Sequence, residues 1–276
     1  MPSPFTPKTL SFLRSLKRNN DRDWFRARKT EYEKHVREPM VALIERLAGD
    51  LPSFAPELVS DPRASMYRIY RDTRFSADKS PLKTHVAAHF PSRAFTRGDG
   101  AGLYLEIAPQ WVWMGGGMYM PSSADLRAIR EHIDATHPRL HALVTGRPFV
   151  RAVGDLGGER LTRVPRGYLQ DHPAAHYLRF RQFLAGCEYE ASFATSPRFY
   201  GELLTVFRAV APLVRFLNAA LENHRGRPPV LTTDGASRTP GLGRDSKRGL
   251  RAGEPDAASA ASRTAQPGAV RPAPMW

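Results

Sequence analysis

The spacing of apolar residues changes along this chain, from a helical period over the first fifty residues to alternation from about residue 65. One helical segment begins at Thr6-Pro7, a second is capped by Asp21, and Pro39 either kinks that second helix or begins a third. Alternating segments, which are typical of strands, follow at 65–70, 84–90, 103–107 and 111–114. Only residues 108–110 separate the last two, and such a short connection cannot make a parallel crossover. The pattern therefore predicts helices followed by a mainly antiparallel sheet.

The second half of the chain returns to helices, with one further strand. We expect helix after Ser122-Ser123 and again over about 139–144, a short helix over 173–178, and a strand over 180–189. A long apolar helix follows Pro197, and Pro212 should kink or split it. The predicted fold class is therefore α+β: a mainly antiparallel sheet from about residues 65–118 and 180–189, packed by N-terminal and C-terminal helices. Residues 1–224 are predicted to form one globular domain.

Composition changes abruptly after His224. Residues 225–276 contain seven Pro, seven Gly and nine Ala, and scarcely any large apolar side chain. Such a segment cannot bury enough surface to offset its chain entropy, so we predict a disordered tail rich in Pro, Gly, Ala and Arg. Its basic charge could add weak contact with polyanions, but an extension without a function is the favoured interpretation.

Cysteine content, hydropathy and charge narrow the class of protein. The one cysteine, Cys187, excludes an internal disulfide and any zinc or iron–sulfur site built from cysteines. The N-terminus has no signal-peptide pattern, and no apolar run approaches the roughly 18–20 residues that cross a bilayer. We therefore expect a cytoplasmic protein without a membrane partner. The net charge of +14 favours anionic partners without specifying one, and the sequence identifies neither a cofactor nor an oligomeric state.

The densest group of chemically active residues lies between residues 68 and 85. Guanidinium and ammonium groups suit a carboxylate or a phosphate. We predict that five cations bind such a ligand: Arg68, Arg71, Arg74, Lys79 and Lys83. Tyr70 and His85 are the candidate acid/base residues, and Asp72 and Asp78 would orient the cations. The alternative is structural, because the same aspartates could pair with these cations and pin a long turn.

Three other features have competing interpretations. His85 and His89 would be adjacent on a helix, but on the strand that their flanks favour they lie ~13 Å apart, so we assign no metal site. Gly115–Gly117 could present N–H groups to an anion, although a strand kink or a close backbone contact is the favoured interpretation. Trp111 and Trp113 are either core residues or a platform on which a base or a sugar stacks.

A set of motifs occurs in a fixed order over roughly residues 4–222. They are Phe5-Thr-Pro, Asn20-Asp-Arg-Asp-Trp24-Phe25, the block from Arg68 to His85, the triple glycine with Met118-Tyr-Met-Pro121, and Arg163-Val-Pro-Arg166-Gly167-Tyr168. In these motifs the chain resembles the widespread bacterial family catalogued as domain of unknown function 2461. The resemblance implies one domain with the tail outside it, and it carries over no established activity. Leu82 stands where members usually have Tyr, and the order of the motifs suggests that Arg163 and Arg166 join the basic cluster.

These observations leave three hypotheses about function. The first is a protein that binds a small anionic ligand, bearing a phosphate or a carboxylate, with His85 or Tyr70 as the acid/base residue if a reaction is catalysed. The alternative is a nucleic-acid-associated protein that uses the same basic segment and the tail, with Trp111 or Trp113 stacking on bases. The third is a non-catalytic structural domain. An enclosed pocket would favour the first, a convex basic stripe the second, and complete pairing of the arginines within the protein the third.

Overall fold

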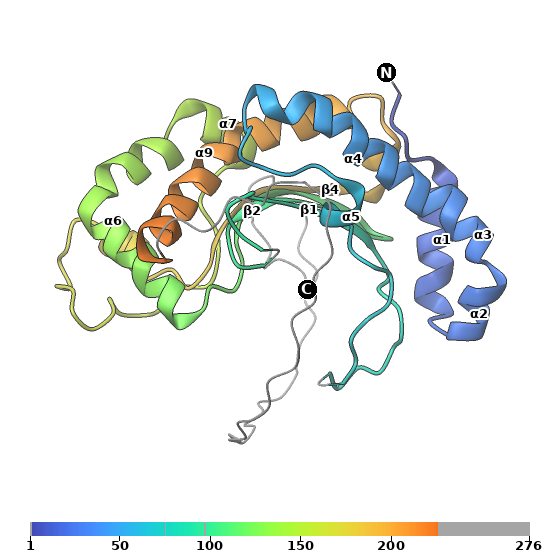
Figure 1. Ribbon diagram of the computed structural model, residues 1–276, viewed down its shortest axis with the longest axis horizontal. Helices are drawn as coiled ribbons and strands as arrows, with labels where there is room; N and C mark the ends of the chain where they lie inside the picture. The colour runs from blue at the N-terminus through green and yellow to red at the C-terminus, as the bar shows by residue number, and fades with distance from the viewer. Residues whose placement is uncertain (1, 75, 97, 226–276) are drawn as a thin grey trace, which may run out of the picture.

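The computed structural model describes residues 2–74, 76–96 and 98–225. The predicted tail lies outside the described residues, except for Arg225 at its start. Helices and a four-stranded antiparallel sheet together make an α+β fold, as the periodicity predicted. In Figure 1 the sheet lies at the centre, with α4, α7 and α9 along one side of it.

The N-terminal helical layer begins where the sequence predicts. α1 (Pro7–Arg18) follows Thr6, whose backbone N–H donates to Thr9 Oγ1 at 3.1 Å. α2 (Arg22–Ala27) is capped by the carboxylate of Asp21, which accepts two backbone N–H groups at 2.8 and 3.0 Å. The layer continues through α3 (Lys29–Tyr32), a π-helical turn (Glu33–Arg37), α4 (Glu38–Asp50), a 3₁₀ turn (Leu51–Ser53) and α5 (Pro62–Ser65). Pro39 lies in the first turn of α4, which directly follows the π-helical turn, so the expected third helix begins beside this proline.

The sheet has the strand order β1-β2-β3-β4, and every pair of neighbours is antiparallel. Its strands are β1 (Val86–Pro91), β2 (Gly102–Ile107), β3 (Trp111–Met118) and β4 (Phe183–Glu190). The predicted connection at 108–110 is a tight hairpin, in which the N–H of Ala108 donates to the carbonyl of Trp111 at 2.9 Å. The sequence therefore located these four strands to within a few residues.

The strand expected over 65–70 does not form. Ser65 ends α5, and the segment makes only isolated bridges, from Met66 to Ala88 and from Tyr70 to Leu82. Residues 69–71 pair with residues 81–83 through single hydrogen bonds, such as the bond from the Lys83 N–H to the Ile69 carbonyl at 2.7 Å. A regular ladder is interrupted because Pro81 has no N–H to donate. Residues 66–74 and 76–85 therefore make the two legs of a long loop, which we call the arm.

The second half adds the remaining helices: α6 (Ser123–Val144), α7 (Arg147–Val153), α8 (Ala175–Leu178), a 3₁₀ turn (Ala191–Thr195) and α9 (Phe199–Arg225). The two helical segments expected after Ser122 join into α6, with a break in helical geometry at Thr136, two residues before Pro138. The sequence did not predict α7, which has a proline in its first turn. Pro212 lies within α9 and does not divide it.

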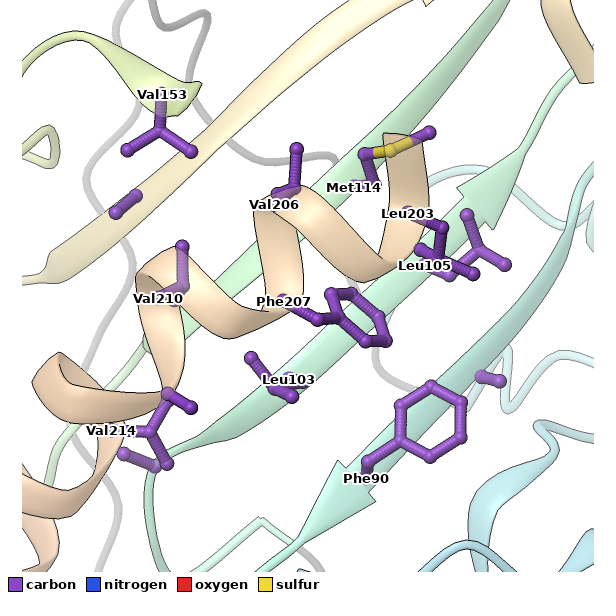
Figure 2. Packing of buried hydrophobic residues seen from close by; sticks show 14 of the residues in the cluster. Phe90, Leu103, Leu105, Met114, Val153, Leu203, Val206, Phe207, Val210 and Val214 are labelled. Atoms are coloured by element: carbon purple, nitrogen blue, oxygen red, sulfur yellow. The ribbon is translucent and has the colours of Figure 1, made fainter. Parts of the chain in front are cut away.

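The main core lies between α9 and the sheet. Side chains of α9 pack onto Phe90, Leu103, Leu105 and Met114 of the strands, as Figure 2 shows, and all four are fully buried. By length and composition α9 could cross a membrane, but most of its apolar stretch is buried inside the fold. From the sequence we expected no apolar run of that length, and α9 corrects this expectation.

The opposite face of the sheet carries a second, smaller cluster. Alternation along the strands places a mixed set of side chains there, among them Ala87, His89, Tyr104, Glu106, Trp111 and Trp113. Ala87, Tyr104 and Trp113 are buried in a cluster separate from the main core, with Tyr67 of the arm packed against them. We call this side of the sheet the aromatic face.

Candidate functional site

The arm leaves the sheet on the side away from α4, α7 and α9 (teal in Figure 1). Its base is fixed at two points. The N–H of Tyr67 donates to the carbonyl of Ala87 in β1 at 3.0 Å. The side chain of Asn20 bonds both the carbonyl and the N–H of Leu82, at 2.8 and 3.0 Å. These contacts set the arm against both the sheet and the helical layer.

The outer part of the arm contains charge pairs. Arg71 forms an ion pair with Asp78 and donates to Ser76 Oγ at 3.3 Å. Arg74 bonds both carboxylate oxygens of Asp72, at 3.0 and 2.7 Å, and this pairing lowers the pKa of Asp72 to about 2. Hydrogen bonds from Ser80, followed by the bond from Arg71, also lower the pKa of Asp78. Pairing of this kind is what the structural interpretation of the arm predicts.

The remaining residues of the predicted site differ in their surroundings. Lys79 Nζ donates to the carbonyl of Thr73 at 3.0 Å, within the arm. Arg68 is exposed, and its charge acts on Asp72. Tyr70 is 49% exposed and packs edge-on against Phe25 with ring centroids 5.9 Å apart. Ligand binding by these residues, and acid/base chemistry by Tyr70, stay predictions.

The base of the arm brings Lys83 and His85 to a buried carboxyl group, Glu106. His85 Nδ1 lies 3.7 Å from Glu106 Oε1, and Tyr104 donates its hydroxyl proton to Oε2 at 2.8 Å. The Lys83 ammonium lies 4.5 Å from the ring centre of Tyr67. Glu106 is fully buried, whereas the side chain of His85 is 17% exposed.

Burial shifts both titratable groups at this point towards their neutral forms. It raises the pKa of Glu106 to about 7, although the Tyr104 hydrogen bond and the Lys83 charge oppose the rise. Burial also lowers the pKa of His85 to about 4, helped by the charges of Lys83 and Arg71. The His85–Glu106 approach is therefore a contact between groups that favour neutrality, and at 3.7 Å it is longer than a hydrogen bond.

A hollow of about 270 Å³ opens on the aromatic face. Six of its lining side chains shape its walls: Tyr67, His89, Tyr104, Trp113, Met118 and Met120. The rest of the lining comes from Tyr119, Leu184 and five glycines, three of which lie in β2 and β3. We call this space the aromatic hollow. Tyr104 both lines it and bonds Glu106, so the hollow and the buried carboxyl group are neighbours.

The glycines beside the hollow are required by close packing. Gly117 has φ +127°, and a Cβ atom there would overlap the carbonyl oxygen of Phe183 in β4. A Cβ atom on Gly186 would lie 2.5 Å from the ring of Trp113, so the missing side chain lets that ring lie against the sheet. The triple glycine is thus explained by close backbone contact, the interpretation that the sequence favoured.

Trp113 is buried, as its interpretation as a core residue predicts, and it also lines the hollow. It is 3% exposed, packs against Tyr104 at 5.9 Å between ring centres, and lines the hollow. Glu106 and Tyr104 were not singled out from the sequence. Their alternation with Leu103 and Leu105 is an ordinary half-buried strand pattern, and nothing local shows that both sides of the strand are buried.

The segment around residue 165, which carries Arg163 and Arg166, lies across the molecule from the arm (yellow in Figure 1). Within residues 2–74, 76–96 and 98–225, no three His, Cys, Asp or Glu side chains are grouped so as to hold a metal ion.

Comparison with known proteins supports the resemblance seen in the motifs. A search of curated proteins found no match. One family model, with the description "Conserved hypothetical protein (DUF2461)", matches residues 8–216. This match covers most of the chain, from α1 into α9, and includes the arm, the aromatic face and the hollow. The chain therefore belongs to the DUF2461 family.

Proposed function

We propose that the aromatic face binds a small organic ligand that carries a carboxylate or a phosphate group. The observation that carries this proposal is the position of the aromatic hollow beside the base of the arm, where Lys83, His85 and Glu106 meet. Ligand sites in proteins are typically apolar hollows with a few convergent polar groups, some of them with shifted pKa values. The hollow and its neighbours have this character.

The apolar part of the ligand fits between ring side chains. Tyr67 is only partly buried and offers ring surface, Tyr104 and Trp113 are buried residues of the lining, and His89 adds a group that can form hydrogen bonds. Pockets for drug-sized ligands usually have volumes of roughly 300–1,000 Å³. At about 270 Å³, the hollow suits a ligand with one ring better than a dinucleotide.

The anionic part is directed to Lys83. This ammonium group lies over Tyr67, which lines the hollow, and its charge acts on His85 and Glu106. A compact charge at the rim of an apolar site attracts a carboxylate or a phosphate strongly, because neighbouring apolar walls screen little of the attraction. Arg71, whose charge also acts on His85, adds to the positive potential. The geometry thus favours Lys83 over Lys79 as the principal cation.

The other two hypotheses have weaker support. A nucleic-acid base cannot stack on Trp113 without displacing its neighbours, because that ring is 3% exposed. The structural hypothesis accounts for the paired charges of the outer arm. It gives no role to a hollow lined by aromatic rings or to a carboxyl group buried beside a lysine.

The proposal is tested by calorimetric titration of the full chain with benzoate, phenyl phosphate, inorganic phosphate and a short oligonucleotide. We expect Lys83→Gln to weaken binding of the best small anion by roughly 10- to 100-fold, the usual loss when a hydrogen bond to a charged group is removed. The matched control is Lys79→Gln, whose ammonium bonds within the arm and should leave the dissociation constant nearly unchanged. Binding of the oligonucleotide alone, or equal losses in the two variants, would contradict the proposal.

A further inference from the structure

Glu106 is surrounded by groups from every element that packs against it. On its own strand Tyr104 donates to Oε2, and on β3 the indole of Trp111 stabilises the carboxylate. His85 approaches Oε1, Lys83 of the arm supplies a positive charge, and Glu188 of β4 supplies a negative one. Oε1 has no hydrogen-bond partner among the described residues.

The balance of charges beside the aromatic face favours a single anionic group at this site. Lys83 is the cation that acts on both Glu106 and His85. Arg71 is already paired with Asp78, and burial keeps His85 neutral. Two anionic groups beside this one half-buried ammonium would repel each other, the more so because Glu106 is fully buried. An ionised Glu106 and an anionic ligand therefore compete for the same positive charge.

We propose that the site takes up its anionic ligand together with one proton, which protonates Glu106. This inference rests on the function proposed above. The proton comes from solvent and forms an O–H bond at Oε1, the oxygen that lacks a hydrogen-bond partner among the described residues, and no bond of the ligand changes. The neutral carboxyl group retains the Tyr104 hydrogen bond at Oε2 while the ligand takes over the attraction of Lys83.

The strand geometry sets the size of the effect. Tyr104, which lines the hollow, is two residues from Glu106, a separation of about 7 Å along a strand. At an effective dielectric constant of about 20, an anion at that distance raises the pKa of a carboxyl group by roughly 1.5 to 2 units. From about 7 in the free protein, the pKa of Glu106 would rise above 8 in the complex. Proton uptake is then largest near pH 8.

The test is calorimetric titration of the full chain with benzoate at pH 8, in Tris and in HEPES, whose ionisation enthalpies differ. The difference between the two buffers gives the protons taken up per ligand, expected to be roughly 0.7 for the wild type. Glu106→Gln should take up none and should bind benzoate about ninefold more tightly than the wild type at pH 8, with equal affinity at pH 6. Glu188→Gln is the matched control, because it removes an exposed carboxylate from the same face and should retain the uptake.

A second measurement needs no ligand. Tryptophan fluorescence of the wild type should titrate near pH 7, because Trp111 and Trp113 flank Glu106, and this transition should be absent from Glu106→Gln. Melting temperatures at pH 6 establish that the variant is folded. Benzoate binding without proton uptake, or the same uptake by Glu106→Gln, would overturn the inference and leave the proposed function standing. No binding of benzoate or phenyl phosphate at any pH would overturn both.

Discussion

Burial acts on two neighbouring groups of opposite kind and favours the neutral form of each. The pKa of Glu106, an acid, is raised to about 7, and that of His85, a base, is lowered to about 4. Between these two values their 3.7 Å contact joins groups that are mostly uncharged, so it contributes little ion-pair energy. Such a carboxyl group lowers stability when it ionises, and a protein retains it most readily where ionisation serves a purpose.

Glu106→Gln should therefore change how stability depends on pH. The carboxyl group titrates near its ordinary pKa of 4.5 in the unfolded chain and near 7 in the folded protein, so folding tightens proton binding. Its contribution is fully present below pH 4.5 and falls as the pH rises through 7, by about 3 kcal/mol in all. Glutamine does not titrate, so the variant lacks this fall. Urea unfolding of both proteins at pH 5 and pH 8 measures the difference.

His85 contributes in the opposite sense over part of the same range. Its pKa is lowered in the folded protein, so stability is lost as the pH falls from 6.5 through about 4. Subtracting the variant's pH dependence from that of the wild type removes this contribution, since both proteins contain His85. Parallel curves for the two proteins would show that Glu106 is not the group that titrates near neutrality.

At the scale of elements, the pairing of β3 with β4 depends on backbone that side chains would push apart. Gly115, Gly116 and Gly117 face Gly186, Ala185 and Leu184 across the ladder. The close approach also seats the Trp113 ring over Gly186, and this ring forms one wall of the aromatic hollow. The same glycines thus set strand spacing and shape the candidate site.

Gly117→Ala should destabilise the protein by about 3 kcal/mol or more. The substitution adds the strain of a positive φ to an overlap with the carbonyl oxygen of Phe183. Gly201→Ala in α9 is the matched control, because a Cβ atom there meets nothing within 4 Å, and it should raise stability by up to about 1 kcal/mol. Chemical unfolding of both variants tests this pair. Equal effects would mean that β3 and β4 can move apart freely.

The sequence predicted elements better than it predicted the site, for a physical reason. Periodicity is local, so it located β1 to β4, the N-terminal helices and α9. It failed for residues 65–70, where alternation is satisfied by pairing between the two legs of the arm instead of by the sheet. It also passed over Glu106, whose burial depends on Trp113 and on the arm, and whose pKa depends on that burial. Such properties arise only when distant segments meet.

At the scale of the whole molecule, a few polar contacts between distant segments hold the layers together. Asn20 joins the N-terminal helices to the arm through both of its bonds to Leu82. Arg225, the last residue of α9, donates from Nε to Asp125 Oδ1 at 3.1 Å and forms an ion pair with it at the start of α6. The side chain of Asp125 is only 6% exposed, and its carboxylate is held by this ion pair and by a hydrogen bond from Ser122 Oγ at 2.7 Å. This contact fixes the last described residue of α9 to the start of α6.

Arg225→Gln in the full chain should lower stability by about 1–3 kcal/mol. Breaking a buried ion pair typically costs 3–5 kcal/mol, and the partial exposure of Arg225, at 33%, reduces that loss. The comparison is Arg74→Gln, which breaks a pair whose side chains are 77% and 44% exposed and should leave stability nearly unchanged. A chain that ends at residue 230 retains Arg225 and every described contact, so it should melt at the same temperature as the full chain. Urea unfolding of the two variants and thermal melting of the shortened chain provide these measurements. If shortening alone lowered the melting temperature as much as Arg225→Gln does, the single-domain boundary proposed at this end of α9 would have to be moved.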